Sequence, residues 1–374
     1  EPGTLDDLGI GQVRDALSDL MFPGISTVQT RARYFLFVPW SFQQAAHTSS
    51  GTALLTKARL SERRFIVTMQ QSGATDGLIG RVAGEQVTTL PSSIYWSALR
   101  RYGILREDRA PNQLRRLITQ RKGTDDDDAP PHDWNIANSP PARFPYEVEG
   151  GFDLTRDEAE WLRERIVTTT QGTYLSHLLT ASQPPDRTLP FWDQPSLPDA
   201  SDQVQRVVRH ADLFSLVMNG AALLYNLLVA EQYECLGYTA IAHPVDDYRE
   251  RLDAWADDVA DAEEALRDWE LPDLWQRVNS VRTTPVGGAT QFFVNSWIAT
   301  IRDGQAPGAA DANPLRGLVA DRERYNKKQQ ARLSSPRLIG TWNGSSGAAP
   351  LSFRWGQASR IITDIIDGLH RAGS

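Results

Sequence analysis

The most apolar stretch of the chain is LFSLVMNGAALLYNLLV, residues 213–229. It contains Ser215, Asn219, Gly220 and Asn226, and it is shorter than the ~20 apolar residues that a bilayer-spanning helix needs. We therefore predict that it forms the centre of a buried helix over residues 201–233. No membrane partner is expected.

Several other segments show helical spacing of apolar residues. Thr155 and Glu158 form a capping-box pattern that predicts a helix start, and Pro23 with Gly24 predicts a helix end. The predicted helices cover residues 11–22, 248–269 and 357–369, and a further helix is predicted to start near Pro91. The fold class is therefore predicted to be mainly α and multi-helical, with a small helix-turn-helix-like or α+β N-terminal part.

The stretch TRARYFLFVPW, residues 30–40, places two arginines before a run of aromatic and aliphatic residues. Ser26 and Gln29 match a capping box, which favours a helix over a strand here. The inward side chains of that helix would be Val28, Ala32, Phe35 and Leu36. In the strand alternative, Arg31, Arg33, Phe35 and Phe37 would share one face.

Arg31 has two possible roles, as a structural ion-pair partner or as a phosphate contact. Its guanidinium could pair with an internal carboxylate such as Asp15 or Asp19, since arginine suits partly buried bidentate pairs. It could instead bind a phosphate. Structural tethering is the favoured interpretation.

The charge of the chain is unevenly distributed. Its net charge is −8, but residues 1–123 hold 16 Lys/Arg against 10 Asp/Glu, and the remainder holds 23 against 37. Residues 121–150 combine an acidic run with several prolines, which is typical of exposed loops. We predict a basic N-terminal helical domain (1–120), a linker or long surface loop (121–150) and an acidic helical domain (151–374).

Catalytic and metal-binding motifs are not found. The six histidines do not occur at zinc-site spacings, and His210 is expected to be a core histidine with one hydrogen-bonded nitrogen. Neighbouring carboxylates in the run 125–128, near His132 and Asp133, cannot all converge on one ion as a preformed site. We expect no metal or cofactor, and whether the protein is an enzyme stays open, with a non-enzyme favoured. The single cysteine, Cys235, and the lack of a secretion signal fit a cytoplasmic protein.

The segment LPSSIYWSALRRYGI, residues 90–104, resembles the second helix of a helix-turn-helix. In that interpretation Ser92, Ser93 and Tyr95 would reach base edges, while Arg100 and Arg101 would contact phosphates. The alternative is a packed helix whose arginines are solvated.

Two further segments are candidates for anion binding. The segment 321–337 contains Lys327, Lys328 and Arg332, which form either an anion-facing stripe or a solvated helix face. The glycine-rich loop 340–347 could hold an anion with its backbone N–H groups, with Arg354 close by, or it could be a tight turn.

Four blocks together resemble a bacterial protein family of unknown function. They are LGIGQVRDALSDLMFPGISTVQTRARYFLFVPW, LIGRVAGEQVTTLPSSIYW, LFSLVMNGAALLYN and ARLSSPRLIGTWNGSSGAAPLSFRW. The resemblance implies no activity. It implies a setting, because genes of that family tend to lie beside helicases and phospholipase-D-like nucleases in anti-phage or mobile defence clusters. Arg31, Arg33, Arg81 and Arg354 lie in or beside these blocks and are candidates for a shared role.

The leading hypothesis is a non-catalytic DNA-associating or scaffolding component of a bacterial anti-phage defence system. Its partners would be DNA and helicase or nuclease subunits of the same system. One alternative is a metal-dependent nuclease, or another enzyme, with carboxylates gathered from distant positions. Another is a purely structural interaction subunit that uses the apolar face of the predicted 248–269 helix.

Overall fold

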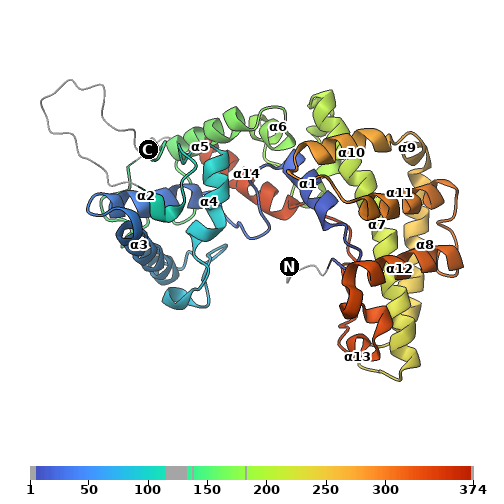
Figure 1. Cartoon of the computed structure of the whole chain (residues 1–374). Coiled ribbons are helices and arrows are strands. Elements are labelled where there is room, and N and C mark those ends of the chain that lie inside the picture. The colour runs from blue at the N-terminus through green and yellow to red at the C-terminus, as the bar shows by residue number, and fades with distance from the viewer. Residues whose placement is uncertain (1–5, 115–132, 137–138, 182, 372–374) are drawn as a thin grey trace, which may run out of the picture. The chain divides into compact units, whose positions relative to one another are not determined.

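The computed structural model describes residues 6–114, 133–136, 139–181 and 183–371. Helices and turns make up these residues, and the described part of the chain contains no strand beyond one isolated bridge between Leu105 and Trp134. The prediction of a mainly α fold is therefore confirmed. Figure 1 shows the helices coloured along the chain.

The chain divides into two compact units, and each is built from segments that are distant in sequence. Unit 1 comprises Glu1–Leu20 and Gln205–Phe353, and unit 2 comprises Met21–Val204 and Arg354–Ser374. The expected boundary at 121–150 differs from this division, because residues on both sides of it belong to unit 2.

The described part of segment 121–150 packs against the rest of unit 2 instead of forming a free linker. Trp134 and Phe144 are buried, and the Phe144 ring lies 5.5 Å from that of Trp40. Aromatic side chains thus anchor this proline-rich segment to the core. The acidic run 125–128 and His132 lie outside the described residues.

The described residues of unit 2 form six α-helices (Figure 1). Helix α2 lies against α3 and α4, and the C-terminal helix α14 lies against α5 and α6. The helices are α2 (Tyr34–Ala46), α3 (Gly51–Gln71), α4 (Pro91–Arg101), α5 (Arg156–Thr169), α6 (Tyr174–Thr180) and α14 (Trp355–His370).

Helix α2 forms the aromatic core of unit 2. The run from Tyr34 to Val38 is fully buried, and the Tyr34 ring lies 5.1 Å from that of Tyr95. The predicted helix start at Ser26 is wrong, because α2 begins at Tyr34, and Val28 is 55% exposed. Residues 26–33 form turns, since distant side chains take up their backbone N–H groups, as described below.

Unit 1 surrounds the long helix α7 (Asp202–Cys235), which confirms the predicted buried helix. The indole N–H groups of Trp255 and Trp297 both donate to α7 carbonyls, at 2.8 Å each. The other helices are α1 (Gly11–Met21), α8 (Pro244–Asp261), α9 (Glu263–Arg267), α10 (Leu271–Ser280), α11 (Gly288–Arg302), α12 (Asn313–Lys327) and α13 (Pro336–Ile339).

Helix α7 is the one helix among the described residues that is long and apolar enough to cross a membrane by length and composition. However, 78% of its most apolar window is buried inside the structure. This is the pattern of a core helix. The polar residue Asn226 is also fully buried there, with its amide hydrogen-bonded to Ser346.

The predicted helix over residues 248–269 is interrupted at Ala262, where α8 ends and α9 follows. Its apolar face, including Leu252, Trp255 and Trp269, is buried in the core of unit 1. This face is therefore not the exposed apolar patch that the structural-interaction alternative requires.

Gly220 allows α8 to approach α7 closely. A Cβ atom at this position would lie 2.1 Å from Trp255. We expect Gly220→Ala to lower the free energy of unfolding by about 1–3 kcal/mol, because the buried indole has to move. Chemical denaturation measures this, with Gly317→Ala as the matched control.

Gly317 is an exposed residue of α12, and an alanine Cβ at this position would meet no atom within 4 Å. Alanine there should raise the free energy of unfolding by roughly 0.5–1 kcal/mol, since it favours the helix. Equal stability of Gly220→Ala and the wild type would contradict the close α7–α8 packing.

Candidate nucleic-acid interface

Arg31 is held by internal partners within unit 2. Its Nε lies 2.9 Å from the nearer carboxylate oxygen of Asp364, and its Nη1 donates to the carbonyl of Asp76 at 3.1 Å. The same Asp364 carboxylate accepts the N–H of Ala32 at 2.9 Å. Structural tethering is thus the observed role, and Asp364 takes the place of the expected Asp15 or Asp19.

Arg33 is almost completely buried. Its guanidinium pairs with Glu158 at 3.0 Å and donates to the carbonyls of Glu149 and Gly151 at 2.6 and 2.8 Å. Glu158 in turn completes the predicted capping box with Thr155 at the start of α5. Arg33 therefore fastens α5 to the start of α2, and its side chain does not face solvent.

The N-terminus of α4 is also buried, which argues against its use as a recognition helix. The Tyr95 hydroxyl accepts the N–H of Thr30 at 2.8 Å and donates to the carbonyl of Arg31 at 2.9 Å. Ser92 is buried as well, whereas Ser93 is exposed. Two of the three side chains expected at base edges thus serve the core.

A carboxylate from another helix caps α4. Glu62 of α3 is fully buried and accepts the Ser92 N–H at 2.6 Å and the Ser92 hydroxyl at 2.8 Å. Burial raises the pKa of Glu62 to about 7, although the bonds from Ser92 oppose this shift. The N-cap residue Leu90 makes no side-chain cap bond, and Glu62 has that role.

Three other candidate arginines of unit 2 lie at its surface. Arg100 pairs with Asp108. Arg81 and Arg101 are exposed, and neither has an ion pair with any residue that the structure describes. These two remain available to an external anion.

The candidates in segment 321–337 belong to unit 1. Lys327 and Arg332 both approach the buried carboxylate of Asp7, at 3.4 and 3.5 Å, so they fasten the N-terminal segment to α12 and the turn that follows it. Arg332 also donates to the hydroxyl of Ser346 at 3.1 Å. Lys328 alone of the three side chains is exposed.

The glycine-rich loop 340–347 binds its own core. The N–H of Ser346 donates to the Asn226 side chain at 2.8 Å, and the carbonyl of Gly344 accepts the Tyr248 hydroxyl at 2.7 Å. This is the tight-turn alternative. Arg354 belongs to unit 2, where it donates to the carbonyl of Ile25 at 2.8 Å.

The nine candidates are divided between the two units, and several of them are held by partners inside their own unit. Six of them belong to unit 2 and three to unit 1. The candidates are Arg31, Arg33, Arg81, Arg100, Arg101 and Arg354 in unit 2, and Lys327, Lys328 and Arg332 in unit 1.

The outward side of α3 is a basic surface that none of the sequence motifs singled out. We call it the α3 basic face and define it by Lys57, Arg59, Arg63 and Arg64. None of these cations has an ion pair with a described residue, and the helix's only acid is the buried Glu62. Positive charge on this side of α3 is therefore not balanced within the helix.

Helical spacing arranges the α3 basic face in two rows. Lys57 and Arg64 are two turns apart and share one row, roughly 10 Å long at 1.5 Å per residue. Arg59 and Arg63 are one turn apart and share the other row, roughly 130° away around the helix. The guanidinium of the half-buried Arg63 also donates to the carbonyls of Glu85 and Val87 at 3.1 and 3.3 Å. Arg81 lies close to the Arg59–Arg63 row, because the Arg81 carbonyl accepts the side-chain amide of Gln70 near the end of α3.

An exposed aromatic ring borders the Lys57–Arg64 row. The guanidinium of Arg64 lies 5.6 Å from the centre of the Tyr146 ring, and Tyr146 is 68% exposed. The backbone beside Tyr146 is anchored to α3, since the Thr68 hydroxyl donates to the Pro145 carbonyl at 2.8 Å. Phe144, on the other side of Pro145, is buried.

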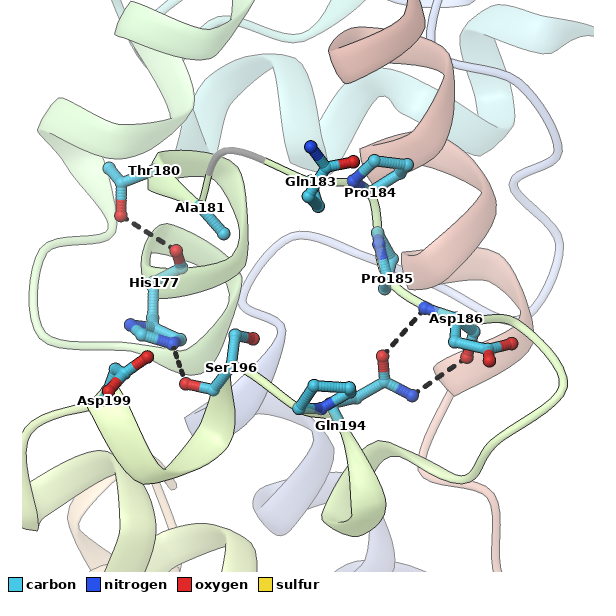
Figure 2. A pocket seen from close by; sticks show the side chains of 11 residues that line it. His177, Thr180, Ala181, Gln183, Pro184, Pro185, Asp186, Gln194, Ser196 and Asp199 are labelled. Carbon is cyan, nitrogen blue, oxygen red and sulfur yellow. Dashed lines mark hydrogen bonds between the residues drawn. The ribbon is translucent and has the colours of Figure 1, made fainter.

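Unit 2 also contains a cavity of about 400 Å³ between α6 and the segment that follows it (Figure 2). His177 Nε2–H donates to the Ser196 carbonyl at 2.7 Å, and the Gln194 side chain bonds to the backbone of Asp186. The lining includes Asp186 and Asp199 but no lysine or arginine. The charge of this cavity does not suit a phosphate.

His210 is a core histidine, as expected, but both of its ring nitrogens are hydrogen-bonded. Its Nδ1 accepts the indole N–H of Trp269 at 2.8 Å, so Nε2 carries the proton and donates to Asp273 at 2.8 Å. Burial lowers the pKa of His210 despite the nearby carboxylate. Neither nitrogen is left to act as a base.

Within the described ranges, no three or more His, Cys, Asp or Glu side chains are grouped so as to hold a metal ion. No cluster of carboxylates in this part of the chain therefore supports the metal-dependent nuclease alternative.

A family model, described as a family of unknown function (DUF6361), matches residues 1–369. The chain belongs to this family. No curated protein and no solved structure gives a significant match.

Proposed function

We propose that this member of a family of unknown function is a non-catalytic, DNA-associating scaffold that contacts phosphates through the α3 basic face. The observation that supports the proposal is the presence of four cations on one helix without an exposed carboxylate. Such a surface attracts a polyanion, because each contacted phosphate releases condensed counterions. Arg81 would extend the contact from the loop beside α3.

The distribution of charge between the units is consistent with this role. Unit 2 holds 23 Lys/Arg against 23 Asp/Glu, whereas unit 1 holds 16 against 24 and so accounts for the whole net charge of −8. The acids of unit 1 include a row of exposed carboxylates on α8. These are Asp246, Asp247, Glu250, Asp253, Asp257 and Asp258. Unit 1 is thus poorly suited to nucleic acid.

The scaffolding part of the proposal assigns the acidic face of α8 to a partner protein. A basic surface on a helicase or nuclease subunit would complement it, in line with the defence-cluster setting that the family resemblance implies. Co-precipitation with such a subunit should weaken strongly when Asp253 and Asp257 are both changed to lysine. Undiminished capture by this variant would remove the assignment.

The α3 basic face is tested by binding of the full chain to fluorescent DNA, both duplex and single-stranded, between 50 and 300 mM salt. We expect Lys57→Gln/Arg59→Gln/Arg64→Gln to weaken binding at least tenfold. The slope of log affinity against log salt should become shallower by about two to three, roughly one per lost phosphate contact.

The matched control is Arg163→Gln/Arg206→Gln/Arg337→Gln, which also removes three positive charges. These arginines are exposed, lie away from α3 in sequence, and have no ion pair with a described residue. The control should bind DNA like the wild type. The proposal fails if neither DNA form binds, if affinity is insensitive to salt, or if both triple variants behave alike.

A further inference from the structure

We infer that the α3 basic face, if it binds nucleic acid as proposed above, prefers a single strand over a duplex, with Tyr146 as a stacking platform for a base. The inference rests on the juxtaposition of Tyr146 and Arg64 at the edge of the Lys57–Arg64 row. Single-strand binding proteins commonly combine a positively charged track with exposed aromatic rings. Cations alone would not distinguish the two forms.

The backbone that carries Tyr146 is held in place, and the ring is accessible. Its backbone N–H donates to the carbonyl of Arg143 at 2.8 Å, and the neighbouring Phe144 is buried with its ring 6.0 Å from that of Phe65 in α3. The ring itself is 68% exposed. A base that stacks on it therefore gains contact area without the entropy loss of ordering a mobile loop.

The charged side chains near Tyr146 favour a single strand of nucleic acid that lies along one side of α3. Lys57 is held at 2.9 Å by the hydroxyl of Thr48, so its ammonium group has a defined place. Glu147, which follows Tyr146, already pairs with Arg143. Phosphates could thus lie over Lys57 and Arg64 while the next base reaches Tyr146.

Stacking on an aromatic ring requires an unpaired base, and the bases of a duplex present their edges, not their faces, to a protein. DNA and RNA single strands share this chemistry. RNA differs from DNA by its 2′-hydroxyl, for which we propose no binding partner. Both kinds of single strand are therefore tested.

The test compares binding of the full chain to oligo(dT), oligo(U) and a duplex of equal length, with Tyr146→Leu, Tyr146→Phe and wild type. Leucine removes stacking but keeps an apolar side chain, whereas phenylalanine keeps the ring. We expect Tyr146→Leu to weaken binding of at least one single strand about five- to tenfold and to leave duplex binding unchanged. Tyr146→Phe should restore the affinity.

The matched control is Tyr325→Leu, because Tyr325 in unit 1 is similarly exposed (65%) and also has an arginine, Arg322, over its ring at 5.8 Å. It should have no effect on binding. As an independent readout, a single strand carrying 5-iodouracil should form a photo-crosslink at Tyr146.

The outcomes separate this inference from the proposed function. Equal effects of Tyr146→Leu and Tyr325→Leu, or equal binding of single strands and duplex, would overturn the stacking inference. In that case a loss of binding in the Lys57/Arg59/Arg64 variant would still support the α3 basic face. Absence of binding to every oligonucleotide would overturn both.

Discussion

Arg33→Ala is expected to lower the free energy of unfolding by about 3–5 kcal/mol, because it leaves the buried carboxylate of Glu158 without its ion-pair partner. It also removes the donor to the carbonyls of Glu149 and Gly151. Denaturant unfolding of the full chain, followed by tryptophan fluorescence, measures the loss. Arg81→Ala, at an exposed arginine, should change stability by less than roughly 0.5 kcal/mol.

A second variant shows whether the loss comes from the unpaired charge. Arg33→Met/Glu158→Gln removes both charges, while glutamine can keep the capping box with Thr155. This double variant should be more stable than Arg33→Ala. If Arg33→Ala is as stable as the wild type, the ion pair of Arg33 with Glu158 does not stabilise the fold. Arg33 would then again be a candidate phosphate contact.

The second large effect is a pH dependence of stability that originates at Glu62. The pKa of this carboxyl rises from 4.5 to about 7 on folding, because it is buried beneath α4. Between these two values the folded state holds a proton that the unfolded state has released. The free energy of unfolding therefore falls as the pH rises through this window, and the contribution levels off above the folded-state pKa.

Glu62→Gln should remove this contribution, since the amide cannot ionise and its oxygen can still accept the Ser92 N–H. Relative to the wild type, the variant should gain about 1–3 kcal/mol between pH 4.5 and pH 8. Denaturation at a series of pH values measures the difference. Glu85→Gln makes the same charge change at an exposed position and should give a flat difference curve. A flat curve for Glu62→Gln would contradict the raised pKa.

Local patterns predicted the helices in which the apolar spacing is strong. The buried helix around residues 213–229 and the helix that begins at Pro91 are confirmed by α7 and α4. The predicted start of α2 was wrong because the deciding partners are remote. Tyr95 accepts the backbone N–H of Thr30, and Asp364 accepts that of Ala32. No local sequence motif predicts these two contacts.

The division into units escaped sequence reasoning for the same reason. Arg31 pairs with a residue 333 positions away, and Arg322 bonds to one 314 positions away. Composition predicted a linker or surface loop at residues 121–150. Trp134 and Phe144 in this segment are nevertheless buried in unit 2.

The candidate site was partly visible in the sequence. Residues 51–71 carry four cations, and the single acid, Glu62, falls on the apolar side of the helix. Assigning a helix to this segment would have revealed the α3 basic face. The candidates Arg31 and Arg33 precede an aromatic run, and burial of that run brings both guanidinium groups to internal partners.

The interleaving of the two units has a consequence for synthesis on the ribosome. Asp364 must emerge before Arg31 can pair with it, and 333 residues separate the two. At about 5–20 residues per second, translation of that interval takes roughly 15–70 s. Throughout this time Arg31 and the N–H of Ala32 lack Asp364, and α5 and α6 lack the helix α14 that packs against them. The nascent chain should therefore be a substrate for holdase chaperones until translation is almost finished.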